Sequence, residues 1–404
     1  MEFNFFTESS KPKGQPVENC QPVRIARDKP QLLMHVSDYM RTNLNRITRH
    51  LLLSVSLASL LASCGDKPSS GASAAAPGPS VAAAPVAEEP VLNLYTARHY
   101  EGDDLIYEAF KKKTGIEVKE TSASADQIIS RMKGEGADGP ADLLITVDAG
   151  RLCRAAELDL LQPVKSAVLD AALPESVRDP AGLWFGFAIR ARVIAYSEER
   201  VQPGEVKTYA DLADPKWKGK ILVRSGDSIY NQSLVAAMVA NEGPEKTMQW
   251  VQGLTANFAR KPLGGDRDQV LAVAQNLGDI AVLNSYYLGQ MANSKDPAER
   301  EAFSKVTILF PDQEGRGTHI NISGAGISKH AKHPGNALKF LEFLASEEAQ
   351  KIFPATSFEY PVDPQNDPSA LHKEWGDFKA DPLNLAKLGE HYKAALAIIE
   401  AAGW

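Results

Sequence analysis

Cysteine is scarce in this sequence, which has three cysteines in 404 residues. Three thiols cannot build the dense disulfide framework that holds small secreted domains together. Cys20 and Cys64 precede residue 90, so Cys153 has no partner in the remainder of the chain. We therefore expect Cys153 to be a small buried helix residue in a body that folds without disulfides.

Long apolar and long basic runs are also lacking. The apolar run Leu51–Leu61 has eleven residues, whereas a helix that crosses a bilayer needs about 20. After residue 90 no basic run is longer than Lys111–Lys113, and the formal net charge is −7. Proteins that bind nucleic acid usually carry a basic patch or stripe. The sequence therefore predicts no membrane span at this run and no nucleic-acid partner.

Motifs of nucleotide binding and nucleophilic catalysis are missing as well. The body has no GxxxxGK[ST] or GxGxxG segment, no serine elbow and no recognisable Cys-His pair. It also lacks the His or Cys clusters typical of zinc and copper, and a loop with the several carboxylates typical of calcium. We therefore expect a binding protein and not an enzyme.

The region before residue 90 has the pattern of an export segment. Arg41–Cys64 reads "RTNLNRITRHLLLSVSLASLLASC", in which arginines precede an apolar run and small residues follow it. The ending "LASC" resembles the lipobox of bacterial lipoproteins, so we expect Cys64 to be lipidated and to begin the mature chain. We interpret residues 1–39 as a misassigned start or vector sequence and residues 40–63 as the lipoprotein signal peptide.

Residues 64–90 are rich in Ala, Pro, Ser and Gly and contain no aromatic residue. Such a segment cannot bury enough apolar area to offset the entropy of ordering it, so we expect a flexible tether between a lipid anchor and a globular body. A body of about 300 residues suggests two lobes. The predicted parts are residues 91–189 (first part of the N-terminal lobe), 190–305 (C-terminal lobe), 306–340 (return to the N-terminal lobe) and 341–404 (C-terminal helical segment).

Strand-like and helix-like segments alternate along this body. Val91–Ala97 has the pattern of a buried strand, and Asp104–Gly115 that of an amphipathic helix closed by glycine. Alternation of this kind predicts α/β lobes whose ligands lie at the carboxyl ends of the strands. The long β-like run Phe185–Ser197 could cross between the lobes, and Val306–Gln313 could cross back. Two crossings would form a hinge.

Four tyrosines follow predicted strands. Tyr100 comes after the first strand, Tyr230 after "ILVRS", and Tyr286 and Tyr287 after "IAVLN". Their positions place all four near the carboxyl ends of strands, where an interlobe cleft would lie. A Tyr-Tyr pair alone is more typical of packing and surface cover, so the pattern is informative only as a set.

The body resembles the periplasmic iron-binding proteins of ABC importers, in particular the branch that holds iron with tyrosines and no external anion. The resemblance spans residues 91–404 and rests on these motifs: "NLYTARHY", "KKTGIEV", "PADLLITVDAGRL", "LWFGFAIRARVIAY", "YADLADPKWKGK", "SIYNQSL", "NSYYLGQM", "PDQEGRGTHINISGAGI" and "AAGW". It implies a two-lobed type II periplasmic-binding-protein fold, in which two parallel or mixed sheets are joined by crossing hinge strands. It also implies delivery of iron to the permease and ATPase of an ABC importer. Together with the lipobox, it leads us to expect a periplasmic monomer anchored to a bacterial membrane through Cys64.

By motif match, the resemblance implies that the metal ligands are Tyr100, Tyr230, Tyr286 and Tyr287, with His99 adjacent. Elementary chemistry agrees, because buried phenolates need a highly charged cation among them. Fe³⁺ is a hard cation that prefers anionic oxygen and can deprotonate a coordinated phenol. Fe²⁺ that is oxidised after capture would have the same ligand set.

Charge balance calls for a cation beside such a centre. Four phenolates around Fe³⁺ leave one surplus negative charge, and the candidate arginines are Arg98, Arg190, Arg192 and Arg224. The sequence does not choose among them. Neighbours on a regular strand point to opposite faces, so His99 and Tyr100 can both face the metal only at a turn.

Two other readings remain open at this stage. The same fold could bind a small anion or a polyamine, which would favour aromatic walls and carboxylates or helix ends over clustered phenols. Alternatively, an enzyme could use tyrosine-ligated iron for redox chemistry, which would need an open coordination position and a substrate pocket.

Overall fold

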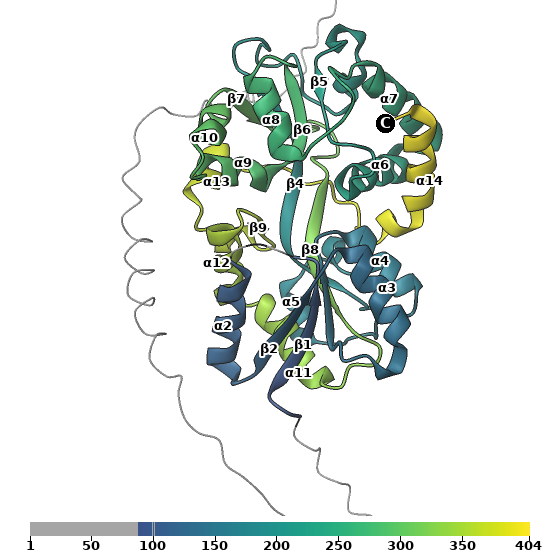
Figure 1. Cartoon of the computed structure of the whole chain (residues 1–404), viewed down its shortest axis with the longest axis vertical. Coiled ribbons are helices and arrows are strands. Elements are labelled where there is room, and N and C mark those ends of the chain that lie inside the picture. Colours follow the sequence, from purple (N-terminus) through teal and green to yellow (C-terminus); the bar gives the residue numbers. More distant parts are fainter. Residues whose placement is uncertain (1–87, 99, 101) are drawn as a thin grey trace, which may run out of the picture. The chain divides into compact units, whose positions relative to one another are not determined.

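Strands and helices alternate through the residues that the structure, a computed structural model, describes: 88–98, 100 and 102–404 (Figure 1). The predicted signal peptide, Cys64, the tether before residue 88 and His99 lie outside these residues. Residues from Glu88 to Trp404 belong to one compact unit. No helix among the described residues is long and apolar enough to cross a membrane.

The first strands form what we call the N-terminal strand group. Strand β1 (Val91–Thr96) pairs in parallel with β2 (Glu117–Ser122) and with β3 (Leu143–Thr146), and β3 pairs antiparallel with β8 (Ile320–Ile327). The predicted first strand and helix are confirmed, and Gly115 ends the helix with φ of 77°, a conformation that favours glycine. Helices on this group are α2 (Asp103–Thr114), α3 (Ala125–Glu135), α4 (Ala149–Glu157), α5 (Ala167–Ala172), α11 (Pro334–Leu344) and α12 (Glu347–Thr356).

The long strand β4 (Phe185–Ser197) links this group to a second one. Its residues Phe185–Ala191 pair with β8, whereas Arg192–Ser197 pair with β6 (Ile280–Asn284) and β7 (Val306–Leu309). The sheet therefore runs continuously in the order β2-β1-β3-β8-β4-β6-β5, and the predicted crossing in this segment is present. The chain returns between β7 and β8, after the strand that the sequence suggested as the return.

The C-terminal strand group consists of β5 (Ile221–Leu222), β6, β7 and the second half of β4. Strand β5 pairs in parallel with β6, and β6 and β7 flank β4 in antiparallel fashion. Buried residues of these strands pack with the adjacent helices in a second hydrophobic cluster that includes Val193, Leu283 and Leu288. The helices of this group are α6 (Ile229–Glu242), α7 (Pro244–Ala256), α8 (Asp266–Ala274), α9 (Ser285–Ala292) and α10 (Pro297–Phe303).

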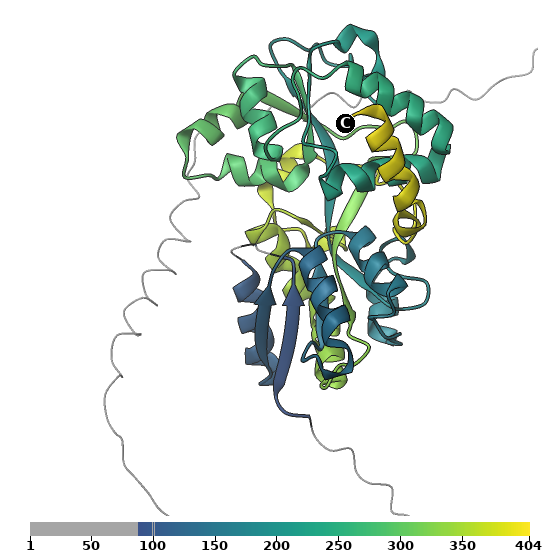
Figure 2. The same cartoon turned by 45° about the vertical axis from the view of Figure 1, so that its right-hand side comes forward.

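The last helix, α14 (Lys387–Ala402), lies beside α6 and α7 in both views (Figure 1 and Figure 2). Its first turn meets α4, since a Cβ at Gly389 would lie 2.5 Å from the Cβ of Cys153. Cys153 is a buried residue of α4, as predicted, and burial raises the pKa of its thiol to about 12. Helix α14 therefore contacts both strand groups. The remaining elements are β9 (Tyr360–Pro361), α13 (Ala370–Trp375) and five short 3₁₀ turns: Gly136–Asp138, Glu175–Val177, Ala210–Ala213, Pro215–Trp217 and Pro364–Asn366.

Candidate metal centre

Tyr100 lies in the turn between β1 and α2, at the carboxyl end of the strand. The carbonyl of Tyr100 accepts a hydrogen bond from the Asp103 amide at 3.0 Å, which forms this turn. Just before it, the Arg98 amide donates to the Thr96 hydroxyl at 2.9 Å. The N-terminal strand group therefore contributes one phenol, at the predicted strand end.

The other three phenols come from helix starts in the C-terminal strand group. Tyr230 lies in the first turn of α6, and Tyr286 and Tyr287 lie in the first turn of α9, directly after β6. Adjacent residues of a helix differ by about 100° in direction. The side chains of Tyr286 and Tyr287 therefore leave the backbone at a wide angle, yet their rings lie side by side.

Helix α9 begins at Ser285, directly after Asn284, and its first turn carries both phenols. Asn284 is the N-cap residue and makes no side-chain capping hydrogen bond. Its Oδ1 accepts from Arg192 at 3.1 Å, and the Ser285 hydroxyl accepts from the Ala191 amide at 3.2 Å. Both side chains instead connect the start of α9 to strand β4.

The four tyrosines converge. The hydroxyl oxygens of Tyr230 and Tyr286 are 3.3 Å apart. The ring of Tyr286 is edge-on to that of Tyr100, with centroids 5.6 Å apart at 81°, and it lies 4.2 Å from the ring of Tyr287. Tyr286 is therefore the central member of a cluster that joins both strand groups.

Burial keeps Tyr100, Tyr286 and Tyr287 protonated in the protein without metal. It raises the pKa of Tyr100 and of Tyr286 well above the usual value of about 10, and that of Tyr287 is also raised. The neighbouring phenols raise the pKa of Tyr286 further, since ionising several phenols together would place like charges side by side. A cation among them is needed to make several phenolates stable at neutral pH.

All four candidate arginines border this cluster. The guanidinium carbon of Arg98 lies 4.6 Å from the centroid of the Tyr100 ring. Those of Arg224, Arg190 and Arg192 lie 5.0, 5.7 and 5.9 Å from the centroid of the Tyr230 ring. The sequence left the choice among these arginines open, and the structure places every one of them beside a phenol.

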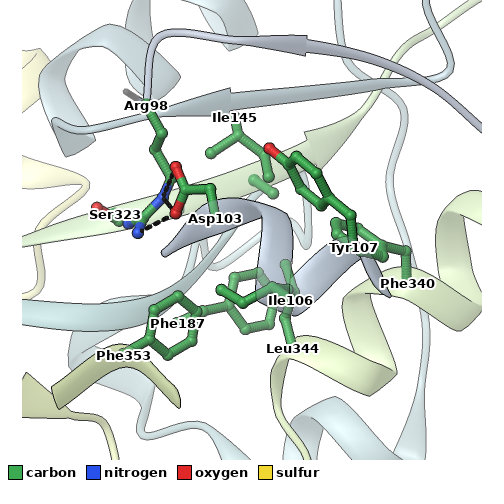
Figure 3. Close-up of a pocket in the computed structure, with 12 residues that line it drawn as sticks. Arg98, Asp103, Ile106, Tyr107, Ile145, Phe187, Ser323, Phe340, Leu344 and Phe353 are labelled. Carbon is green, nitrogen blue, oxygen red and sulfur yellow. Dashed lines mark hydrogen bonds and ion pairs between the residues drawn. The ribbon is translucent and has the colours of Figure 1, made fainter. Parts of the chain in front are cut away.

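Three carboxylates pair with these arginines, and the sequence analysis identified none of them. Asp103 pairs with Arg98 at 2.7 Å (Figure 3), and Glu359 pairs with Arg98 at 2.8 Å and with Arg190 at 3.3 Å. Asp266 pairs with Arg192 at 2.9 Å and, more loosely, with Arg224 at 3.7 Å. Asp266 stands in "GGDRDQ", which carried no recognisable motif, and Glu359 stands in "SFEYP", which gave no local signal.

These ion pairs contain four guanidinium groups and three carboxylates, which leaves one surplus positive charge. His319, which shares a small pocket with Arg190, Arg192 and Tyr230, adds none, because burial and the nearby arginines lower its pKa to about 3. Four phenolates around a trivalent cation carry one surplus negative charge. The surroundings and a loaded centre would therefore be neutral together.

The donors at this position are phenol oxygens and not the usual ligands of divalent transition metals. Within residues 88–98, 100 and 102–404 no group of three or more His, Cys, Asp or Glu side chains could hold a metal ion. Anionic oxygen in this number suits a hard, highly charged cation. The arrangement therefore favours Fe³⁺ over zinc, copper or calcium.

Comparisons with known proteins agree with this chemistry. The profile of the bacterial extracellular solute-binding protein family matches residues 138–377. The chain is 43% identical over 370 residues to "Iron uptake protein A1" of Synechocystis. The aligned stretch covers 89% of this chain and 99% of that protein.

Solved structures give the same result. The Trichodesmium protein FutA in complex with iron and citrate superposes with a TM-score of 0.76 and 46% identity, over 78% of this chain and 99% of that one. A ferric binding protein from Campylobacter jejuni superposes with a TM-score of 0.74 and 40% identity, over 77% of this chain and 99% of that one. The predicted α/β periplasmic-binding-protein fold is thereby confirmed.

Proposed function

Because the chain belongs to the bacterial extracellular solute-binding protein family, we propose that it captures ferric iron for uptake and hands it to an ABC importer. The observation that carries this proposal is the convergence of four tyrosines from two strand groups beside four arginines. The relatives are named for iron uptake and ferric iron binding, so binding and release, without turnover, is the function we assign.

In this proposal the phenol oxygens of Tyr100, Tyr230, Tyr286 and Tyr287 bind the ion as phenolates. Tyr100 is supplied by the N-terminal strand group and the others by the C-terminal group, so the ion bridges the two. The arginines offset the surplus negative charge, and the burial of the rings excludes water from the ion. His99 follows Arg98 directly in the sequence and is proposed as an additional ligand.

Visible spectroscopy tests the proposal. Titration of the metal-free protein with ferric ion should produce a phenolate-to-iron charge-transfer colour that saturates at one ion per chain. Absence of colour would favour a small anion or a polyamine as the ligand of this fold. Colour together with catalytic turnover would favour the redox enzyme, which the family relationship does not support.

Removal of iron should open the cleft between the strand groups. We expect hinges at Arg190–Ser197 and Val306–Pro311, since the chain passes between the groups in or beside these segments. Opening would have to break the hydrogen bond from the Ser233 hydroxyl of α6 to Asp148, which caps α4, with a length of 2.6 Å. Small-angle scattering should show a larger radius of gyration without iron, and an unchanged envelope would contradict this prediction.

We also propose that the protein is held at a membrane surface in the periplasm through a lipid on Cys64. Acyl chains contribute about 0.8 kcal/mol per buried CH₂, so a multiply acylated terminus should remain anchored. The C64A variant should therefore move from the membrane fraction to the soluble fraction, as seen by fractionation and immunoblotting. A C153A variant is the matched control and should stay with the membranes. Retention of C64A at wild-type levels would contradict the anchor.

The partners that this function requires are the permease and ATPase subunits of an ABC importer. We propose that the protein meets them as a monomer, since one chain supplies all four phenols of the centre. Co-purification of the iron-loaded protein with the permease in detergent tests this partner.

A further inference from the structure

Glu359 is a fully buried carboxylate behind the tyrosine cluster. It lies between helix α12 and strand β9, and its side chain has no exposed surface. Its Oε1 accepts from the Ser323 hydroxyl at 2.7 Å and from Arg190 at 3.3 Å. Its Oε2 accepts from Arg98 at 2.8 Å and from the Ser357 hydroxyl at 3.2 Å. Each oxygen therefore has one guanidinium and one hydroxyl partner.

The two arginines that Glu359 joins belong to the metal centre. The guanidinium carbon of Arg98 lies 4.6 Å from the centroid of the Tyr100 ring and 5.3 Å from that of the Phe353 ring. Arg190 lies 5.7 Å from the centroid of Tyr230. A guanidinium presents a planar fork of donors that matches an oxyanion. Glu359 faces Nη1 of each arginine, since Nε and Nη2 of Arg98 bind Asp103 and Nη2 of Arg190 binds the Ile322 carbonyl. The two buried Nη1 groups would bind a small external anion if no carboxylate occupied them.

We propose that Glu359 is the built-in anion of the metal centre and a positioning residue for its arginines. It occupies the Nη1 donors of Arg98 and Arg190, so that the phenols can bind ferric iron without an anion from solution. This inference rests on the proposed function, because it concerns the same centre. The chemical class of ligand that Glu359 replaces is a small oxyanion such as phosphate or a carboxylate.

The second pair of arginines has a looser version of this arrangement. Asp266 is also fully buried and lies between Arg192 and Arg224, which flank the ring of Tyr230. It accepts in addition from the Asn284 amide at 3.0 Å, immediately before the Tyr-Tyr pair. Both sides of the cluster therefore have an arginine-carboxylate-arginine unit, and in the second unit Arg192 is the arginine within hydrogen-bond distance of the carboxylate.

A purely structural ion pair would stabilise the fold without changing what the centre binds. The two interpretations differ when the charge alone is removed. Glu359→Gln keeps the size of the side chain but deletes its negative charge, so two guanidinium groups beside the phenols lose their shared counter-charge. If Glu359 acts as the anion of the centre, an external anion should then supply the missing charge by binding beside the same two guanidinium groups, since the glutamine still fills the position of the carboxylate.

The experiment uses the full metal-free chain as wild type and as E359Q, with inorganic phosphate as the probe. Ferric ion is titrated against a hydroxamate competitor, with and without excess phosphate, and followed by the charge-transfer band. In E359Q we expect phosphate to strengthen iron retention about tenfold or more and to shift the band, because it restores charge-assisted hydrogen bonds to two arginines. The wild type should change less than about twofold, since its arginines are already occupied.

E135Q is the matched control. Glu135 also pairs with one arginine, Arg131, and with one tyrosine hydroxyl, that of Tyr95, but it lies on α3 and touches no member of the cluster. This variant should respond to phosphate as the wild type does. Folded E359Q that retains iron equally with and without phosphate would overturn the proposal.

Loss of a buried carboxylate can also unfold a protein, so circular dichroism and thermal melting accompany each titration. If E359Q does not fold, the titration of the wild type tests the proposal. Iron retention by the wild type that rises tenfold with phosphate would overturn it, and iron retention that is the same with and without phosphate would support it. Failure of the proposed function has a different signature, because the wild type itself would then give no charge-transfer colour under either condition.

Discussion

Replacement of both Tyr286 and Tyr287 by phenylalanine should abolish ferric ion binding and leave the fold intact. Tyr286 is the centre of the cluster, with its hydroxyl 3.3 Å from that of Tyr230 and its ring in contact with two others. Phenylalanine keeps the ring and its packing and deletes one oxygen. The two phenols that remain cannot balance the charge of Fe³⁺, so binding should collapse.

Each single variant should show an intermediate effect. Loss of a group that only orients a ligand typically costs 10–100-fold in metal affinity, so we expect a loss of about 100-fold or more from deletion of a ligand itself. The charge-transfer band of each should weaken or shift. Titration with ferric ion measures this, and thermal melting followed by circular dichroism measures the fold.

Tyr95→Phe is the matched control for these variants. Tyr95 is a buried tyrosine of β1 whose hydroxyl donates to Glu135 at 2.9 Å, away from the cluster. This variant should bind iron and develop colour as the wild type does. Retention of both iron and colour by the double variant of Tyr286 and Tyr287 would rule out both as ligands.

Ferric ion binding should release at least three protons per ion and weaken steeply as the pH falls. Burial raises the pKa of Tyr100, Tyr286 and Tyr287 in the protein without metal, so all three phenols are protonated at neutral pH. Coordination as phenolate displaces each proton. Lowering the pH by one unit should therefore reduce the apparent affinity about 1000-fold, or tenfold for each proton displaced.

Proton release can be measured directly in weakly buffered solution, with a blank titration of the ferric complex that is added. Tyr287→Phe should release one proton fewer than the wild type, which ties the protons to particular phenols. A release of fewer than two protons per ion in the wild type would contradict ligation by this cluster.

That the four tyrosines lie close together could be predicted, because the position of each one after a strand can be recognised in a short stretch of sequence. Every one of the four follows a strand within eight residues, and the carboxyl ends of strands are where α/β proteins place their ligands. The family resemblance, which the profile and the relatives confirm, rested on the same short motifs. His99 and Cys64 remain predictions, since both lie outside the residues that the structure describes.

The carboxylates of the centre could not be predicted in this way. Glu359 pairs with Arg98 across 261 positions of the chain, and no periodicity or spacing records a contact of that separation. The same limit applies to the side-chain contacts of Asn284 and Ser285. Their sequence suits capping, but Arg192 and Ala191 of strand β4 take their side chains.

The sequence by itself determined the alternation of strands and helices, the crossing strand and the four phenols, because patterns within about ten residues encode each of them. The tertiary structure alone decided that all four candidate arginines border the phenols and that Glu359 and Asp266 share them in pairs. The physical reason is that a buried charge is stable only beside a partner of opposite charge, and the fold can bring that partner from any part of the chain.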